Sequence, residues 1–203
     1  MNVPIMNQFI TPDLKPALER FKLFRSGQTG ERIFRYPTCH PSHPTGFCPC
    51  DQAWPATMWF YFKSALLLTA LKLPFNGLKV AMLRWSGAHV GRDVFISTDV
   101  WIDPTFPELL TIEDEVMMGV GAKIFLHLFN PDNFQAGRVV LRKNAVIGGY
   151  ALIGLGVEIG KGAVVAAGAV VRRDVPAGMA AIGNPAQIVP LRDSRTAEPK
   201  PHE

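Results

Sequence analysis

Residues 141–175 read LRKNAVIGGYALIGLGVEIGKGAVVAAGAVVRRDV, and large aliphatic side chains recur in them at every sixth position. The members of this series are Leu141, Ile147, Ile153, Ile159, Val165 and Val171. A second series, four positions further on, holds small or β-branched residues: Ala145, Ala151, Val157, Ala163, Ala169 and Val175. A period of six does not match the helical period of about 3.6, and the many glycines would destabilise helices. We therefore expect a repeat of short strands in which both series point inward.

The same phase continues toward the N-terminus with two interruptions. The upstream members are Val90, Ile96, Ile102, Ile112, Met118 and Ile124, paired with Val94, Val100, Phe106, Val116, Ala122 and Leu128. Four extra residues near 108–111 and eleven near 130–140 break the phase, and such insertions become surface loops in a stacked repeat. Three hexapeptides can close one triangular coil, with the next coil about 4.8 Å above it. The sequence thus predicts a mainly β fold, a parallel β-helix of about four coils.

The closing passage resembles a known family. Residues 159–189, IGKGAVVAAGAVVRRDVPAGMAAIGNPAQIV, are similar to the final coil of the hexapeptide-repeat acyltransferases, sugar O-acetyltransferases among them. The resemblance extends over residues 88–190, about half of the chain. It implies a left-handed parallel β-helix, an exception to the usual right-handed crossover. It also implies a homotrimer with acetyl-CoA as co-substrate in the groove between neighbouring subunits.

Composition suggests one domain with an extension. The chain has 203 residues, of which 48% are hydrophobic and 19% charged, and these values exclude a largely disordered protein. We expect an N-terminal extension over residues 1–87, with helices and a Pro-rich loop, the β-helix over 88–191, and a polar tail over 192–203.

Charge is distributed unevenly along the chain. Residues 1–89 hold ten Lys/Arg and four Asp/Glu, a balance of +6, whereas residues 90–203 hold eleven and thirteen, a balance of −2. No acidic residue lies between Asp51 and Asp93. An anionic surface such as phospholipid headgroups suits this stretch. Nucleic acid is not an expected partner, because there is no Lys/Arg cluster and no nucleic-acid motif.

A candidate membrane segment precedes the repeat. Residues 53–73 have the length of a spanning helix, but Lys63 lies at their centre, and Pro55 and Pro74 bound them. We expect no membrane span here. A helix packed on the protein and an interfacial helix remain as alternatives, and the second would allow peripheral membrane contact through residues 53–84.

The N-terminus and the cysteines indicate a cytoplasmic protein, with a peripheral position at the inner face of the membrane as the alternative. The first residues contain no secretory signal, and the three cysteines are an odd number that suits reduced thiols. Cys39, His43, Cys48 and Cys50 lie in one short run. These side chains could form a zinc site, but their spacing matches no standard zinc finger, and we favour a Pro-rich loop without metal.

His127 is the candidate general base for acyl transfer. A neutral imidazole is well matched to that role near pH 7. His127 directly precedes the long insertion, where the family places its catalytic histidine, and its neighbours in adjacent coils, Thr105 and Gly156, are small. Asp103 and Asp132 are candidates for orienting the imidazole or binding the acceptor.

The resemblance also implies the positions that bind the co-substrate. Gly149 and Ala167 match the family's small positions along the pantetheine arm. Arg172 and Arg173 occupy the place of a common Thr-Lys pair and suit the nucleotide phosphates.

The resulting hypothesis is an acetyl-CoA-dependent O-acetyltransferase acting on a sugar hydroxyl, with a role in cell-surface polysaccharide biosynthesis. Its acceptor would be a saccharide or a nucleotide- or lipid-linked sugar. An N-acyltransferase of an amino sugar and a non-catalytic trimeric scaffold are the alternatives. A carbonic anhydrase is excluded, because that version of the fold needs three zinc-binding histidines and the repeat contains only His89 and His127.

Overall fold

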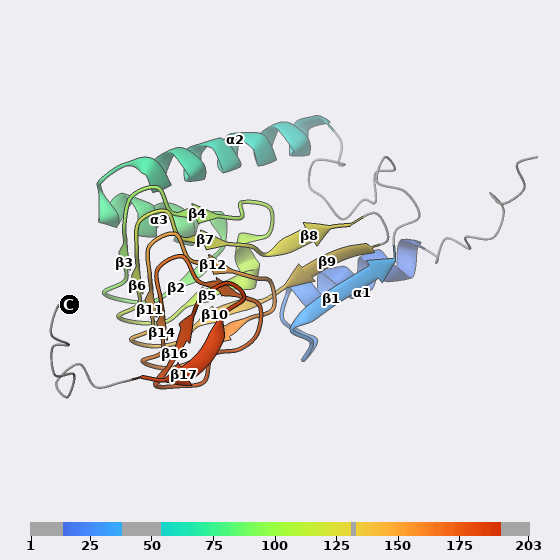
Figure 1. The fold of residues 1–203 in the computed structure, drawn as a ribbon. Coiled ribbons are helices and arrows are strands. Elements are labelled where there is room, and N and C mark those ends of the chain that lie inside the picture. The colour runs from blue at the N-terminus through green and yellow to red at the C-terminus, as the bar shows by residue number, and fades with distance from the viewer. Residues whose placement is uncertain (1–13, 38–53, 131–132, 192–203) are drawn as a thin grey trace, which may run out of the picture.

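The computed structural model describes residues 14–37, 54–130 and 133–191. A parallel β-helix with three faces forms the main body (Figure 1). The first face consists of β2 (His89–Val90), β5 (Leu110–Ile112), β10 (Val139–Leu141) and β13 (Glu158–Ile159). The second consists of β3 (Phe95–Ile96), β6 (Met117–Met118), β11 (Val146–Ile147), β14 (Val164–Val165), β16 (Met179–Ile182) and the antiparallel β17 (Gln187–Pro190). The third consists of β4 (Trp101–Ile102), β7 (Lys123–Ile124), β12 (Leu152–Ile153) and β15 (Val170–Val171).

Strand register confirms the predicted insertions. Val90 pairs with Ile112, 22 positions later, and Ile112 pairs with Leu141, 29 positions later. Leu141 then pairs with Ile159 at the undisturbed spacing of 18. The two longer steps contain the four and eleven extra residues. The first insertion forms the 3-10 helix η2 (Pro107–Leu109), and the second forms a hairpin.

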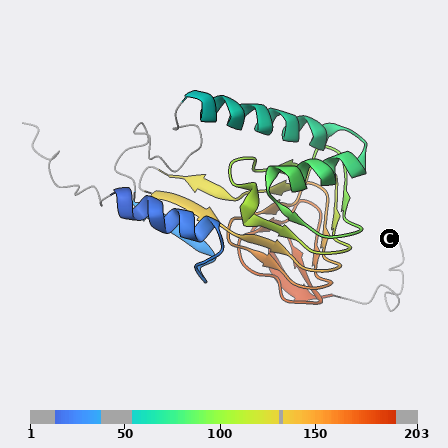
Figure 2. The same ribbon diagram turned by 180° about the vertical axis from the view of Figure 1, so that it is seen from behind.

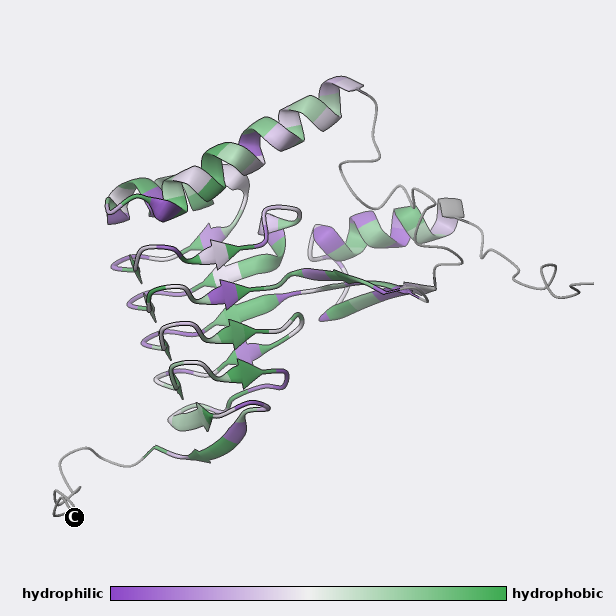
Figure 3. Ribbon diagram, turned by 45° about the horizontal axis from the view of Figure 1, so that its top comes forward, coloured by the Kyte–Doolittle hydropathy of each residue, from purple (hydrophilic) through white to green (hydrophobic). Residues whose placement is uncertain are grey.

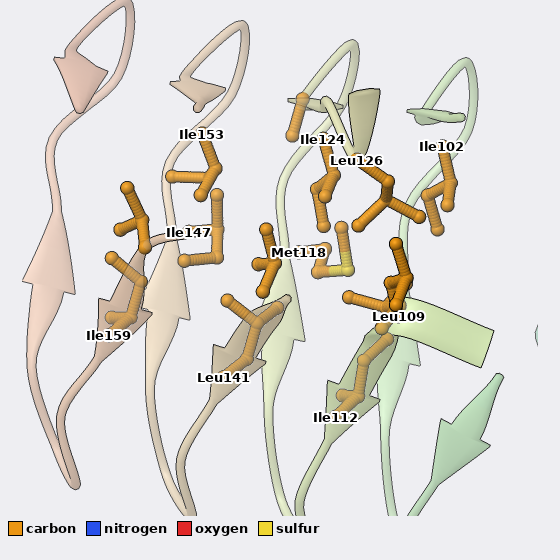
Figure 4. Packing of buried hydrophobic residues seen from close by; sticks show 14 of the residues in the cluster. Ile102, Leu109, Ile112, Met118, Ile124, Leu126, Leu141, Ile147, Ile153 and Ile159 are labelled. Carbon is orange, nitrogen blue, oxygen red and sulfur yellow. The ribbon is translucent and has the colours of Figure 1, made fainter. Parts of the chain in front are cut away.

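The two aliphatic series fill the interior of the coils, as predicted (Figure 4). From Val94 to Val175 their members are at most 4% exposed, with one exception. Leu128, predicted to point inward, is 43% exposed. Here the prediction is wrong, because the chain leaves the coil after Leu126, which fills the last inward position and is fully buried.

The long insertion forms β8 (His127–Phe129) and β9 (Asn133–Gly137), which pair antiparallel. An N-terminal strand, β1 (Ile33–Pro37), pairs antiparallel with β9 on its other side and completes a three-stranded sheet. Helix α1 (Leu14–Arg25) lies against this sheet (Figure 2). Five phenylalanines from α1, β1, β9 and the coil pack into one cluster: Phe21, Phe24, Phe34, Phe106 and Phe134. The described parts of residues 14–37 and 54–87 therefore share one continuous core with the β-helix.

One glycine joins β1 to the coils. Gly156 has a φ of +73°, and a Cβ at this position would overlap the side chain of Ile33 in β1. Glycine is needed here both for its backbone conformation and for the close approach of the N-terminal strand.

Two helices lie across the N-terminal end of the coils (Figure 3). Helix α3 (Asn76–Ser86) covers the first coil, and its Lys79 is only 1% exposed. The Lys79 Nζ donates to the carbonyl oxygens of Ile96 at 2.9 Å and Ser97 at 2.7 Å. Burial lowers the pKa of Lys79, and the two carbonyl acceptors compensate for the lost hydration of its ammonium group.

Helix α2 (Trp54–Lys72) lies over α3 and buries only Leu67, Ala70 and Leu71. Most of its N-terminal half is exposed. None of the helices in the described part of the chain is both long and apolar enough to cross a membrane.

Candidate active site

His127 lies where the third face ends and the hairpin begins. It follows the buried Leu126 and is the first residue of β8, so the coil and the hairpin together fix its backbone. The rings of Phe106, Phe129 and Phe134 surround the imidazole, with centroids at 5.6, 6.1 and 6.3 Å. Its side chain is 24% exposed. The imidazole is thus held in an aromatic environment with one accessible edge.

Asp103 is the partner of His127. It follows β4 in the coil below and is 1% exposed. One carboxylate oxygen, Oδ1, accepts the backbone N–H of Thr105 at 2.9 Å. The other, Oδ2, accepts the N–H groups of Leu126 at 3.2 Å and His127 at 3.1 Å, and also contacts the imidazole Nδ1. Four nitrogen contacts therefore compensate for burial of this charge.

The electrostatics of this pair select one form of the histidine. Burial by itself raises the pKa of Asp103, but the hydrogen bond and charge of His127 and the bonds from Thr105 outweigh it and leave the pKa below its ordinary value. Asp103 is therefore ionised at neutral pH and can only accept hydrogen bonds. Nδ1 of His127 carries a proton toward Asp103, and in the neutral ring Nε2 keeps its lone pair. This is the arrangement that a general base requires.

A groove of about 600 Å³ opens beside His127. The coils contribute Phe125, Leu152, Gly154, Leu155, Val170 and Arg172 to its lining. The three-stranded sheet and the turn of its hairpin contribute Ile33, Arg35, Leu128, Asn130 and Gln135. The groove thus has a coil wall and a sheet wall, with His127 between them.

The other residues singled out in the sequence occupy different places. Arg172 lies in the groove, and the adjacent Arg173 is exposed. Gly149 and Ala167 lie at the opposite edge of the third face, at equivalent positions in successive coils, where the N–H of Gly168 donates to the Gly149 carbonyl at 2.9 Å. The structure therefore brings Asp103, His127 and Arg172 to one edge of the third face. Gly149 and Ala167 lie at its other edge.

Two sequence proposals lie outside the described residues. Asp132 lies in 131–132, and the run from Cys39 to Cys50 lies in 38–53. Within the described part of the chain, no three His, Cys, Asp or Glu residues are grouped in a way that could hold a metal ion.

The sheet wall of the groove was missed by the sequence reasoning. The sequence contained a signal for it, because apolar Phe34 and Tyr36 flank the charged Arg35, which is the alternation typical of a half-buried strand. In the structure Phe34 and Tyr36 are buried and Arg35 is exposed. The stretch is only five residues long, and nothing local indicates that its partner is β9, about 100 positions away.

Comparison with known proteins relates this architecture to acetyltransferases. No protein-family model matches the chain. It is 29% identical over 144 residues to a protein of Bacillus subtilis (strain 168) named "Putative acetyltransferase YvoF", and the match covers 66% of this chain and 84% of the relative.

Solved structures match more of the chain. A hexapeptide-repeat acetyltransferase of Vibrio cholerae, in complex with acetyl-CoA, is 21% identical and has a TM-score of 0.52, with 70% of this chain and 92% of that one covered. The fold is that of the hexapeptide-repeat acetyltransferases. A maltose O-acetyltransferase of Clostridium difficile 630 gives 20% identity and a TM-score of 0.52, over 68% and 86% of the two chains. A galactoside acetyltransferase in complex with coenzyme A is 14% identical and has a TM-score of 0.52, with 86% of this chain and 92% of that one covered. The expected left-handed parallel β-helix is confirmed.

Asp103 provides a test of the electrostatics of the site. We expect Asp103→Asn to lower the free energy of unfolding at pH 7 by about 1–3 kcal/mol, because the buried N–H donors lose an ionised acceptor. The folded-state pKa of Asp103 is depressed, so its contribution exists above the ordinary carboxyl pKa and is lost as the pH falls through the folded value. The difference in free energy of unfolding between the wild type and Asp103→Asn should therefore disappear at acid pH.

Urea denaturation at a series of pH values from about 7 to 2 measures this difference. Asp99→Asn is the matched control, since Asp99 is an exposed turn residue with a φ of 59° that asparagine also tolerates. If the difference in free energy of unfolding stays constant with pH, Asp103 is not the ionised acceptor described above.

Proposed function

We propose that this chain is an acetyl-CoA-dependent O-acetyltransferase that acts on a sugar hydroxyl, with a role in cell-surface polysaccharide biosynthesis. The observation that carries the proposal is the buried Asp103 carboxylate against Nδ1 of His127, at the mouth of a groove on this fold. The names of the structural neighbours, two of which are sugar acetyltransferases, support the choice of acceptor.

His127 acts as the base in this proposal. Its Nε2 takes the proton of the acceptor hydroxyl, which must lie within about 3 Å. Asp103 stabilises the imidazolium that forms and prevents the ring from turning. The acceptor oxygen would attack the thioester carbonyl of acetyl-CoA, the C–S bond would break, and coenzyme A would leave as a thiol that takes the proton from Nε2.

The co-substrate would extend along the third face. Arg172 and the adjacent Arg173 suit its phosphates, because guanidinium groups bind phosphate oxygens bidentately. Gly149 and Ala167 leave room for a narrow chain at the far edge of that face. We assign these four residues to acetyl-CoA.

The test of the proposed function uses His127. We expect His127→Ala to lower turnover by roughly 10² to 10⁴, the usual contribution of a general base, and to leave acetyl-CoA binding largely unchanged. Acetyl-CoA-dependent thiol release is measured on a panel of sugars and amino sugars, and co-substrate binding is measured by calorimetry.

His127→Asn accompanies this variant, because loss of the imidazole also removes ring contacts and a partner of Asp103; thermal melting shows whether either variant is merely unfolded. Near-wild-type turnover in a folded variant would refute the assignment. Preferential acetylation of amino sugars would favour the N-acyltransferase, and a wild type that binds no acetyl-CoA would favour the scaffold.

We also propose that the chain forms a homotrimer. The outward positions of the second face form a column of apolar residues in strand register: Phe95, Met117, Val146 and Val164. Phe95 and Met117 are 48% and 50% exposed. The first face presents His89, Thr111, Val140 and Glu158 at the equivalent positions. The second face is therefore better suited to contact between subunits.

Light scattering tests this assembly. A mass of about 67 kDa, three times the chain mass of 22.3 kDa, is expected for the wild type, and Met117→Glu should dissociate it because a buried charge is costly. Thr111→Glu on the first face is the control and should remain trimeric. A monomeric wild type, or dissociation by the control alone, would overturn the proposal.

We further propose that α2 and α3 bring the enzyme to the inner face of a membrane. Their exposed apolar side chains include Trp54 at 76%, Phe62 at 56% and Phe75 at 64%. Lys63, Lys72 and Arg84 accompany them, and residues 52–92 contain no Asp or Glu. Aromatic rings with basic neighbours suit the interface of an anionic bilayer.

Vesicle cosedimentation tests the membrane proposal. Binding to phosphatidylglycerol vesicles should exceed binding to phosphatidylcholine and should weaken as salt rises. The double variant Trp54→Ser, Phe62→Ser should lose most of it, whereas Tyr150→Ser, which removes an aromatic ring 67% exposed on the coils, should not. Equal binding by all three proteins, or none by the wild type, would refute the proposal.

A further inference from the structure

The arginines of the described chain fall into two groups. There are ten of them in residues 14–37, 54–130 and 133–191. Seven donate to a carboxylate or a carbonyl oxygen: Arg20, Arg25, Arg32, Arg84, Arg92, Arg138 and Arg142. The other three, Arg35, Arg172 and Arg173, have no hydrogen-bond acceptor or ion-pair partner among the described residues. The arginines that lack a partner among the described residues are therefore found at and beside the His127 groove.

Arg35 lies on the sheet wall of that groove. It pairs with Gln135 in β9, and Gln135 pairs with Leu128 in β8, so the three residues form one row across the sheet. Residues directly opposite one another on paired strands share a face, and all three line the groove. Phe34 and Tyr36, on either side of Arg35, are buried on the other face.

None of the described residues that line the groove is acidic. It holds two guanidinium groups that have no partner in the described part of the chain, Arg172 on the coil wall and Arg35 on the sheet wall, with His127 between the walls. Such an arrangement gives the groove a positive potential and favours an anionic ligand. A guanidinium binds phosphate or carboxylate oxygens with two parallel hydrogen bonds.

Two ligands meet at His127 in the proposed reaction, and they have different needs. The thioester of acetyl-CoA must lie at the imidazole, and the phosphates lie at the far end of the pantetheine arm. Arg172 and Arg173 on the coils suit those phosphates. Arg35 comes from a strand outside the coils and faces the groove from the opposite wall.

We infer that the acyl acceptor carries an anionic group, a phosphate or a carboxylate, and that Arg35 binds it. This inference rests on the proposed function and narrows its acceptor from saccharides in general to charged ones. Arg35 is a binding residue in this scheme: it positions the acceptor hydroxyl at His127 and takes no part in proton transfer.

The test compares matched acceptors. Glucose and galactose are assayed beside their 6-phosphates and the corresponding uronic acids, so that the neutral, phosphate and carboxylate forms of one sugar are distinguished. We expect the wild type to have a higher kcat/KM for a charged form than for the neutral sugar. Arg35→Gln should lower kcat/KM for that charged form by about 10- to 100-fold and leave the neutral sugar unchanged.

Three further variants separate Arg35 from other effects. Arg35→Lys keeps the charge without the bidentate geometry and should retain part of the preference. Arg172→Gln should weaken acetyl-CoA binding without altering the choice of acceptor. Arg92→Gln removes a guanidinium that is 85% exposed away from the groove and should change neither property. Melting temperatures of all variants are compared with the wild type.

Binding measured without turnover separates this inference from the proposed function. Calorimetric titration with glucose 6-phosphate and with glucuronate should show binding to the wild type that Arg35→Gln loses. If this binding occurs but no acceptor is acetylated, the anion site stands and the proposed function fails.

If neutral sugars are acetylated and neither charged probe binds, the proposed function stands and the inference fails. The inference also fails if no charged probe is bound or acetylated at all. If Arg35→Gln weakens acetyl-CoA and leaves acceptor choice intact, Arg35 serves the co-substrate and the inference is wrong.

Discussion

Every coil must place an aliphatic side chain over the one below it, and this stacking constrains the rest of the molecule. The interior of the β-helix is narrow, and its side chains pack without space for an additional residue. An inserted residue therefore has to leave the coil at a corner and return in phase. The eleven-residue insertion obeys this rule: it leaves after Leu126, forms β8 and β9, and rejoins the ladder at Val139. His127 is the first residue outside the ladder, so the constraint on packing also places the candidate base.

A buried carboxylate beside such an apolar core requires compensation. Asp103 has it because the chain turns away from the coil at this point, which leaves the N–H groups of Leu126 and His127 without strand partners and directs them at Oδ2. The corner that ends the ladder thus supplies both the imidazole and the donors that keep its partner ionised. Stability and reactivity depend here on the same few backbone groups.

The sequence predicted what depends on periodicity and failed where distant segments meet. Six-residue spacing was sufficient for the coils, their register and both insertions, because each coil contacts only its neighbours. Placing Asp103 beside His127 required only one coil step. Leu128 was misplaced because continuing the phase gives no indication of where the chain leaves the coil. Arg35 was missed because β1 meets β9 through a pairing about 100 residues apart, which no local pattern specifies.

The position of β1 also affects how the chain behaves while it folds. The hairpin of β8 and β9 protrudes from the coils, and without β1 the outer side of β9 is a row of unpaired N–H and C=O groups. Such an edge invites pairing with another chain. The coils can form by adding one rung to the next, but pairing β1 with β9 joins segments about 100 residues apart, and such distant contacts form slowly. The segment that forms the sheet wall of the groove thus also protects the hairpin from self-association once it has paired with β9, and until then the edge is exposed.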